Sequence, residues 1–150
     1  MKNILLPTDF SENSWNAISF ALNLFKNERC TFFLLNTYTP ILHNTEYLLI
    51  NPSDFKLVDI YKETSVNGLK EINERIDDEF KNPNHHISQV SSFSTLIGEI
   101  EDLHEEYVMD FIVMGTKGAT GAKEILIGSN TVHVLNKIKF PIIAVPENFH

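Results

Sequence analysis

The stretch FIVMGTKGATGAKEILIGSNT, residues 111–131, determines how the rest of the chain can be arranged. It opens with a short apolar run, Phe111–Met114, which predicts a buried strand. A loop with glycines at 115, 118, 121 and 128 follows, and Ser129–Thr131 then predicts the first turn of a helix that runs to about Ile138. Glycines allow the backbone to approach a ligand closely, and a helix start offers free N–H groups with a partial positive charge. The stretch therefore predicts a phosphate-binding loop.

The glycine spacing separates this loop from two common phosphate-binding motifs. The chain contains no Gly-Lys pair, which a Walker A loop requires, and no G-x-G-x-x-G dinucleotide fingerprint. Its own pattern is Gly115-x2-Gly118-x9-Gly128-Ser129. Taken alone, the loop is also compatible with a simple turn that leads the chain into its last helix.

Composition limits the class of protein. The chain has 150 residues, of which 43% are hydrophobic, so we expect one domain, residues 1–150, with a substantial core. The formal net charge of −8 argues against duplex nucleic acid and anionic membranes as general partners. The single cysteine, Cys30, lies in an apolar run and predicts a buried, reduced thiol. Pro7 and Asp9 interrupt the apolar run at the amino terminus, so we expect no secretory signal and a cytoplasmic protein.

Apolar runs and helical stripes alternate regularly along the chain. Strands are expected near residues 3–6, 30–38, 86–93, 111–114 and 142–145, and helices near 11–25, 53–82, 96–107 and 129–138. Most of the strand runs are continuously apolar, which indicates burial on both faces of a parallel sheet. We therefore expect an α/β fold: a doubly wound, five-stranded parallel sheet, order 3-2-1-4-5, with helices on both faces.

This topology places a ligand site without reference to the loop. In doubly wound sheets, ligands bind beyond the carboxyl ends of the strands, where the strand order reverses. Here the first and fourth strands flank that point, so Pro7-Thr8-Asp9 and Met114–Gly118 should meet there. The glycine-rich loop and the topology thus predict the same site.

Two other segments carry predictions of their own. The helix near 53–82 should bury one stripe along its length, although Gly68 in its middle is a poor helix former; the stripe is Val58, Tyr61, Val66, Leu69, Ile72, Ile76 and Phe80. Residues Ile41 to Pro52 fit no element, and a sheet-edge cover, a lid, a partner surface and an ordinary packed connection all stay open for them.

Segments along nearly the whole chain resemble those of a known family: ILLPTDFSENSWNAISFA (4–21), FFLLNTY (32–38), DFIVMGTKG (110–118), FPIIAVP (140–146) and the G-x2-G-x9-G-S pattern of the loop. With these segments the chain resembles the universal stress protein family, in its single-domain, ATP-binding form. This resemblance implies an adenine-nucleotide alpha-hydrolase-like, Rossmann-like fold, a role as a stress-response regulator with a downstream protein partner, and ATP as ligand, with Mg²⁺ carried by its phosphates and no metal ligand from protein side chains. Asn36, Ser94, Leu96, His104, Val108 and Asn130 depart from the usual family residues.

The resemblance also implies roles for particular positions. It places Asp9, flanked by Pro7 and Thr8, near the adenosine, the backbone of Thr37 near the adenine, and Met114 with Gly115 under the ribose. The phosphates would lie against the loop and the last helix, and the residues implied there are Lys117, Gly118, Gly128, Ser129, Asn130 and Thr131.

Other functions remain as alternatives. A slow ATP hydrolase is one, but the sequence indicates no positioned general base and no catalytic residue, so at most weak activity is expected. A nucleotide-free dimeric scaffold or chaperone-like module is another. A receiver-like phospho-acceptor role for Asp9 would need further acidic residues at the strand ends, and only Asp9 stands there.

The final strand predicts a homodimer. Ile142, Ile143, Ala144 and Val145 form a short apolar run between Pro141 and Pro146. In the expected strand order this run is a sheet edge, and an apolar edge is prone to association unless it is paired. The same strand of a second copy, antiparallel about a two-fold axis, would pair both edges. Family members are also mostly dimers, as the resemblance implies.

Overall fold

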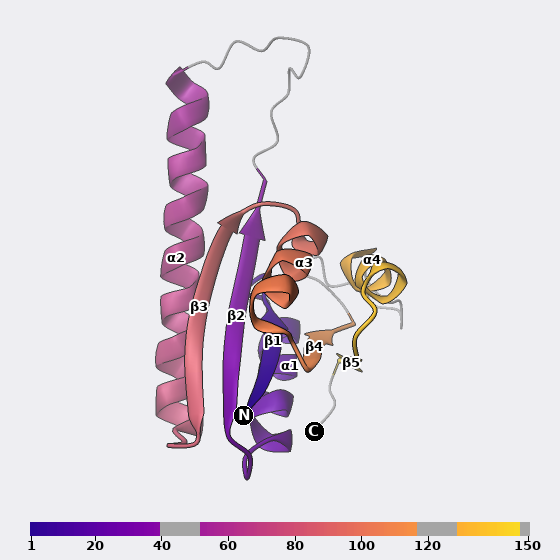
Figure 1. The fold of residues 1–150 in the computed structure, drawn as a ribbon. Coiled ribbons are helices and arrows are strands. Elements are labelled where there is room, and N and C mark those ends of the chain that lie inside the picture. The colour runs from indigo at the N-terminus through magenta and orange to yellow at the C-terminus, as the bar shows by residue number, and fades with distance from the viewer. Residues whose placement is uncertain (40–51, 117–128, 148–150) are drawn as a thin grey trace.

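The computed structural model describes residues 1–39, 52–116 and 129–147, without the side chains of 52–55 and 129–130. Strands and helices alternate throughout (Figure 1), as expected from the sequence. The elements are β1 (Lys2–Pro7), α1 (Glu12–Leu24), β2 (Cys30–Tyr38), α2 (Pro52–Phe80), β3 (His85–Phe93), α3 (Leu96–Tyr107), β4 (Phe111–Gly115), α4 (Ser129–Lys137) and β5 (Ile142–Val145).

The strands form one parallel sheet in the order β3-β2-β1-β4-β5, which confirms the predicted fold class. β2 is paired with β1 from Cys30 to Leu35 and with β3 along its whole length. The register between β1 and β4 is shorter, with Ile4 opposite Phe111 and Leu5 opposite Ile112. The order of the strands reverses between these two.

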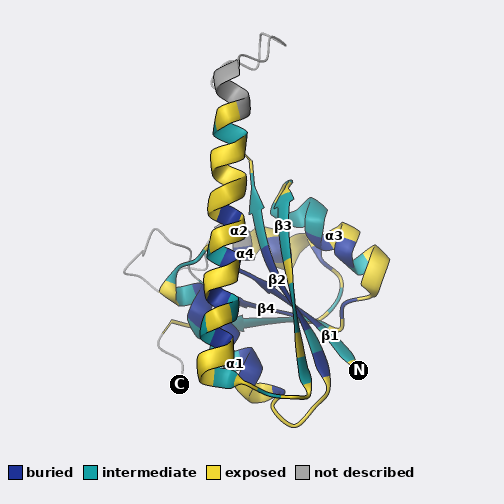
Figure 2. Ribbon diagram, turned by 90° about the vertical axis from the view of Figure 1, so that its left-hand side faces the viewer, coloured by how far each residue is buried: buried dark blue, intermediate teal, exposed yellow. Residues whose placement is uncertain are grey.

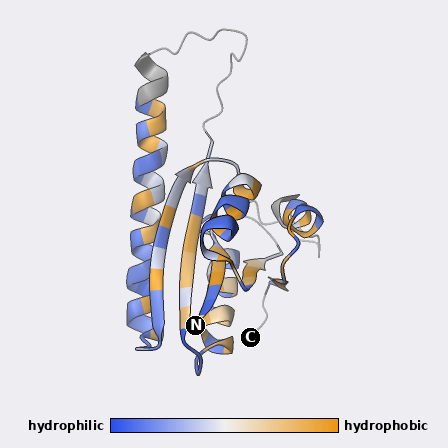
Figure 3. Cartoon of the chain, in the orientation of Figure 1, coloured by the Kyte–Doolittle hydropathy of each residue, from blue (hydrophilic) through white to orange (hydrophobic). Residues whose placement is uncertain are grey.

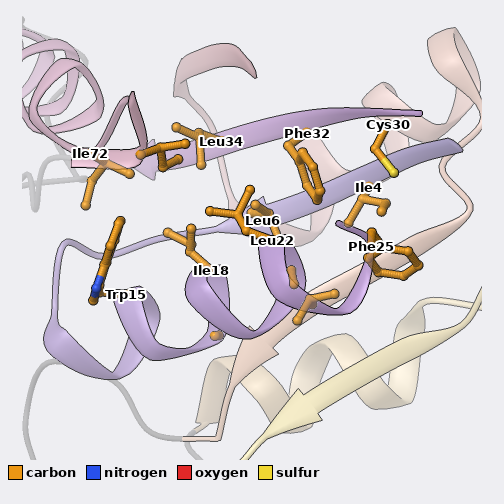
Figure 4. Packing of buried hydrophobic residues seen from close by; sticks show 14 of the residues in the cluster. Ile4, Leu6, Trp15, Ile18, Leu22, Phe25, Cys30, Phe32, Leu34 and Ile72 are labelled. Carbon is orange, nitrogen blue, oxygen red and sulfur yellow. The ribbon is translucent and has the colours of Figure 1, made fainter. Parts of the chain in front are cut away.

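Helices cover both faces of the sheet, so alternate residues of each central strand enter different cores. Leu6 of β1 packs with α1 and α2, whereas its neighbour Leu5 packs with α3 and α4. Figure 4 shows the first of these cores. Trp15, Ile18 and Leu22 of α1, with Phe25 directly after the helix, point toward Ile4 of β1 and Phe32 and Leu34 of β2. Burial on both faces explains why the strand sequences are continuously apolar.

Helix α2 is buried along only part of the predicted stripe. Apolar residues occur along its whole length (Figure 3), but burial is confined to the half that lies on the sheet (Figure 2). Leu69, Ile72 and Ile76 are buried, whereas Tyr61 is 39% exposed and Val66 is 44% exposed. The amino-terminal turns of α2 extend beyond the ends of β2 and β3 (Figure 1), where the sheet offers them no surface.

Strand β3 lies at the edge of the sheet, as the expected strand order placed it. Its apolar residues do not share a face. Ile87 packs on the α1–α2 side, Val90 packs on the α3–α4 side, and Phe93 is 55% exposed.

Other expectations concern single residues and segments. Cys30 is buried and free, and burial raises the pKa of its thiol, as expected for a reduced core cysteine. Within the part of the chain that the structure describes, no helix is both long and apolar enough to cross a membrane. Residues 41–51 of the unassigned segment lie outside the described residues, and Pro52 begins α2.

Candidate functional site

The turn between β1 and α1, residues 7–11, is the first side of the candidate site and is named here the β1–α1 corner. Its second residue, Thr8, is buried, and strand β2 holds both of its backbone polar groups. The Thr8 amide donates to the carbonyl oxygen of Leu35 at 2.8 Å, and the Asn36 side chain donates to the Thr8 carbonyl at 2.8 Å. The corner is therefore fixed to the neighbouring strand.

A chain of hydroxyl groups fixes the corner from inside. The Ser14 hydroxyl donates to the carbonyl of Ser11 at 2.8 Å, so its only proton is used there. The Thr8 hydroxyl, 2.8 Å from Ser14 Oγ, must then be the donor in that pair, and it also accepts from the Phe10 amide at 3.0 Å. The Thr8 hydroxyl thus donates to Ser14 of α1 and accepts from Phe10 within the corner.

Asp9 lies on the outside of the same turn. Its Oδ1 accepts from the Ser11 amide at 3.0 Å, and its side chain is exposed. Ser11 in turn caps α1, because its hydroxyl accepts from the Ser14 amide at 3.2 Å. The carboxylate of Asp9 is therefore held at the carboxyl end of β1, at the surface.

The second side of the site is the end of β4 with the start of α4. Gly115 ends β4, and the Thr131 hydroxyl donates to its carbonyl oxygen at 2.8 Å. Thr131 is 3% exposed and Met114 is 6% exposed, so both side chains lie inside the protein. The hydrogen bond holds the first turn of α4, which includes Ser129 and Asn130, beside the end of β4.

Strand β2 supplies the third side. Thr37 lies two residues beyond Leu35, which is the partner of Pro7, so Thr37 stands past the end of β1. The structure thus brings the following residues to the carboxyl end of the sheet: Pro7, Thr8, Asp9, Thr37, Met114, Gly115 and the first turn of α4. Lys117, Gly118 and Gly128 lie outside the described residues.

The structure adds residues that sequence reasoning missed. Ser14 and Asn36 fasten the β1–α1 corner, although neither was predicted as a site residue. Phe10 has a positive φ of 69°, and its ring packs on Gly68 of α2, where a Cβ would lie 2.5 Å from the ring. A polar residue ending an apolar run, as Asn36 does, was the available signal; nothing local indicated the contact between Phe10 and Gly68.

The charges at this edge suit a ligand with two chemically different ends. The exposed Asp9 carboxylate accepts hydrogen bonds and so suits hydroxyl or amino groups. The first turn of α4 contains no acidic residue, and its backbone N–H groups suit an anion. Within residues 1–39, 52–116 and 129–147, no group of three or more His, Cys, Asp or Glu side chains is placed to hold a metal ion.

Comparison with known proteins gives the family. The model of the universal stress protein family matches residues 1–146. The chain belongs to the universal stress protein family. Universal stress protein MJ0577 of Methanocaldococcus jannaschii is 30% identical over 165 residues, covering 96% of this chain and 94% of that protein.

Solved structures of the family share the fold. The structure of MJ0577 superposes with a TM-score of 0.80 at 26% identity, covering 99% of this chain and 98% of the other. A universal stress protein in complex with cAMP gives a TM-score of 0.62 at 19% identity, with 96% of each chain covered. A family protein of Arabidopsis thaliana with AMP bound gives 0.64 at 12% identity, covering 99% of this chain and 93% of that one.

Proposed function

We propose that this universal stress protein is a small cytoplasmic regulator that binds ATP between β1 and β4. One observation carries the proposal. The β1–α1 corner and the first turn of α4 both lie at the carboxyl end of the sheet, where the strand order reverses between β1 and β4. That is the position at which doubly wound sheets bind ligands.

The residues present fit a nucleoside phosphate. Asp9 is proposed to accept hydrogen bonds from the adenosine, and the backbone of Thr37 to contact the adenine. The first turn of α4, from Ser129 to Thr131, is proposed to hold phosphate through its backbone N–H groups. Lys117, Gly118 and Gly128 are proposed to complete the phosphate site.

Two further considerations support an adenine nucleotide. The relatives solved with AMP and with cAMP have the same fold and carry ligands of this chemical class. The G-x2-G-x9-G-S pattern of residues 115–129 matches the signature of nucleotide-binding family members. Mg²⁺ enters the proposal as an ion carried by the phosphates, where it would offset their charge.

Calorimetric titration with ATP tests the proposal. Gly118→Val and Gly128→Val are expected to abolish binding, because a branched side chain would occupy phosphate space and resist a positive φ. Circular dichroism and thermal unfolding of both variants control for loss of the fold. Unchanged ATP affinity in both variants would remove the loop from the site.

We also propose a homodimer formed through β5. The carbonyl of Pro141 accepts from the Ile112 amide of β4 at 3.0 Å, and the carbonyl of Val145 accepts from the Thr116 amide, directly after β4, at 3.1 Å. Backbone direction alternates along a strand, so the N–H groups of Ile142 and Ala144 point away from β4, toward the open edge. Helix α4, which precedes β5 in the chain, exposes two apolar side chains that a partner could cover, Val132 at 38% and Leu135 at 43%.

A further inference from the structure

Phe10 has an unusual backbone conformation. Its φ of 69° lies in the left-handed region, which side chains other than Gly, Asn and Asp rarely adopt. Phenylalanine has no polar group that could stabilise this conformation through a local hydrogen bond. The conformation must therefore be maintained by the residues around Phe10.

Two contacts maintain it. The Phe10 amide donates to the Thr8 hydroxyl at 3.0 Å, and the Phe10 ring lies against the backbone of Gly68 in α2. A Cβ on residue 68 would lie 2.5, 2.6 and 2.7 Å from Cζ, Cε1 and Cε2 of the ring. Only glycine accommodates the ring at this distance, which explains a residue that otherwise weakens the middle of a helix.

The contact joins the candidate site to a helix outside it. Phe10 lies between Asp9 and Ser11, whose amide holds the Asp9 carboxylate. On the other side, the region of α2 around Gly68 is fixed to the sheet: Leu69 is 1% exposed, and Ser65 Oγ lies 2.7 Å from Ser91 Oγ of β3. A shift of α2 at Gly68 would therefore displace the Phe10 ring and with it the turn that carries Asp9.

We propose that Phe10 and Gly68 are positioning residues for the nucleotide site, so that helix α2 sets its affinity through the β1–α1 corner. This inference rests on the proposed nucleotide binding. Phe10 has a backbone conformation that phenylalanine rarely adopts, and Gly68 is a poor helix former in the middle of a helix. The two residues are in contact beside the candidate site. Such local conflicts are typical of places where function constrains structure.

A double-mutant cycle tests the inference by calorimetry with ATP. Gly68→Ala is expected to weaken binding at least about tenfold, because the new methyl group displaces the ring. In the Phe10→Asn background, where Asn tolerates a positive φ and the ring is gone, Gly68→Ala is expected to change the affinity less than about twofold. Should Phe10→Asn alone abolish binding while its thermal unfolding stays cooperative, the ring is required and the proposal also stands.

Ile76→Ala is the matched control on the same helix. Ile76 is 2% exposed and lies about two turns along α2 from Gly68, so its truncation lowers stability away from the contact between Gly68 and Phe10, and the ATP affinity should stay unchanged. If Phe10 and Gly68 had a purely structural role, ATP affinity would follow stability, and whichever of Gly68→Ala and Ile76→Ala is less stable would bind ATP more weakly. If the wild-type protein binds ATP and Gly68→Ala binds it with the same affinity, this inference is overturned and the proposed function is left intact. No binding by the wild-type protein would overturn both.

Discussion

At the scale of single residues, Thr131 gives the sharpest test of how the site is assembled. Its buried hydroxyl donates to Gly115 at the end of β4. Thr131→Val keeps the shape and leaves that carbonyl without its partner, so the free energy of unfolding should fall by about 1–3 kcal/mol. ATP affinity should fall with it, because the first turn of α4 loses its attachment to β4.

Thr131→Ser is the matched control, because it keeps the hydroxyl. Its ATP affinity should remain close to that of the wild type, and chemical denaturation should show the smaller loss of stability. Equal ATP affinity in the Val and Ser variants would show that this hydrogen bond does not position the proposed phosphate site.

The sequence predicted where the site residues lie better than how their side chains point. Asp9 and Gly115 follow apolar strand runs, so their placement at one edge follows from topology. The inward direction of the Thr8 and Thr131 hydroxyls depends on partners at Ser14 and Gly115, which no spacing rule identifies. The Phe10 conformation depends on Gly68, which lies far along the chain in α2.

At the scale of elements, helix α2 should behave as two unequal halves. Leu69 is 1% exposed on the half that packs on the sheet, whereas Ile60 is 58% exposed on the half that extends beyond it. Leu69→Ala should cost about 2–5 kcal/mol of unfolding free energy through lost burial and a cavity. Ile60→Ala should change it by less than about 0.5 kcal/mol.

Urea denaturation of both variants measures this difference. A cost for Ile60→Ala as large as that for Leu69→Ala would show that the extended half is buried in solution. The apolar stripe of α2 overpredicted burial because periodicity records which residues share a helix face and not where the opposing sheet ends.

At the scale of the whole molecule, the homodimer through β5 can be tested at one backbone group. Ala144→Pro removes an N–H that points away from β4, so it should weaken pairing with a second copy and leave the β4–β5 ladder in place. Ala144→Ser keeps the N–H and is the control. Light scattering should give a dimer for the wild type and the Ser variant, and a shift toward monomer for the Pro variant.

A wild-type protein that stays monomeric at tens of micromolar, with and without ATP, would contradict the dimer proposal. In that event the β5 edge must be covered in some other way.

The fold was the most predictable property of the chain. Five apolar runs alternate with helical stripes in the sequence, and the handedness of crossovers leaves few arrangements, so the order β3-β2-β1-β4-β5 was expected and is confirmed. The proposed phosphate-binding half of the site rests on a sequence pattern, because Lys117, Gly118 and Gly128 lie outside the described residues.

The central claim is that an adenine nucleotide binds at the carboxyl ends of β1 and β4. Two-dimensional ¹⁵N–¹H NMR of the protein during titration with ATP tests it most directly, because the method locates the ligand as well as detecting it. We predict that the largest shift changes occur at the amides of Asp9, Thr37, Gly115 and Ser129–Thr131. No change at millimolar ATP would contradict the claim. So would changes centred on the amino end of the sheet, around Asn84–His86 at the start of β3.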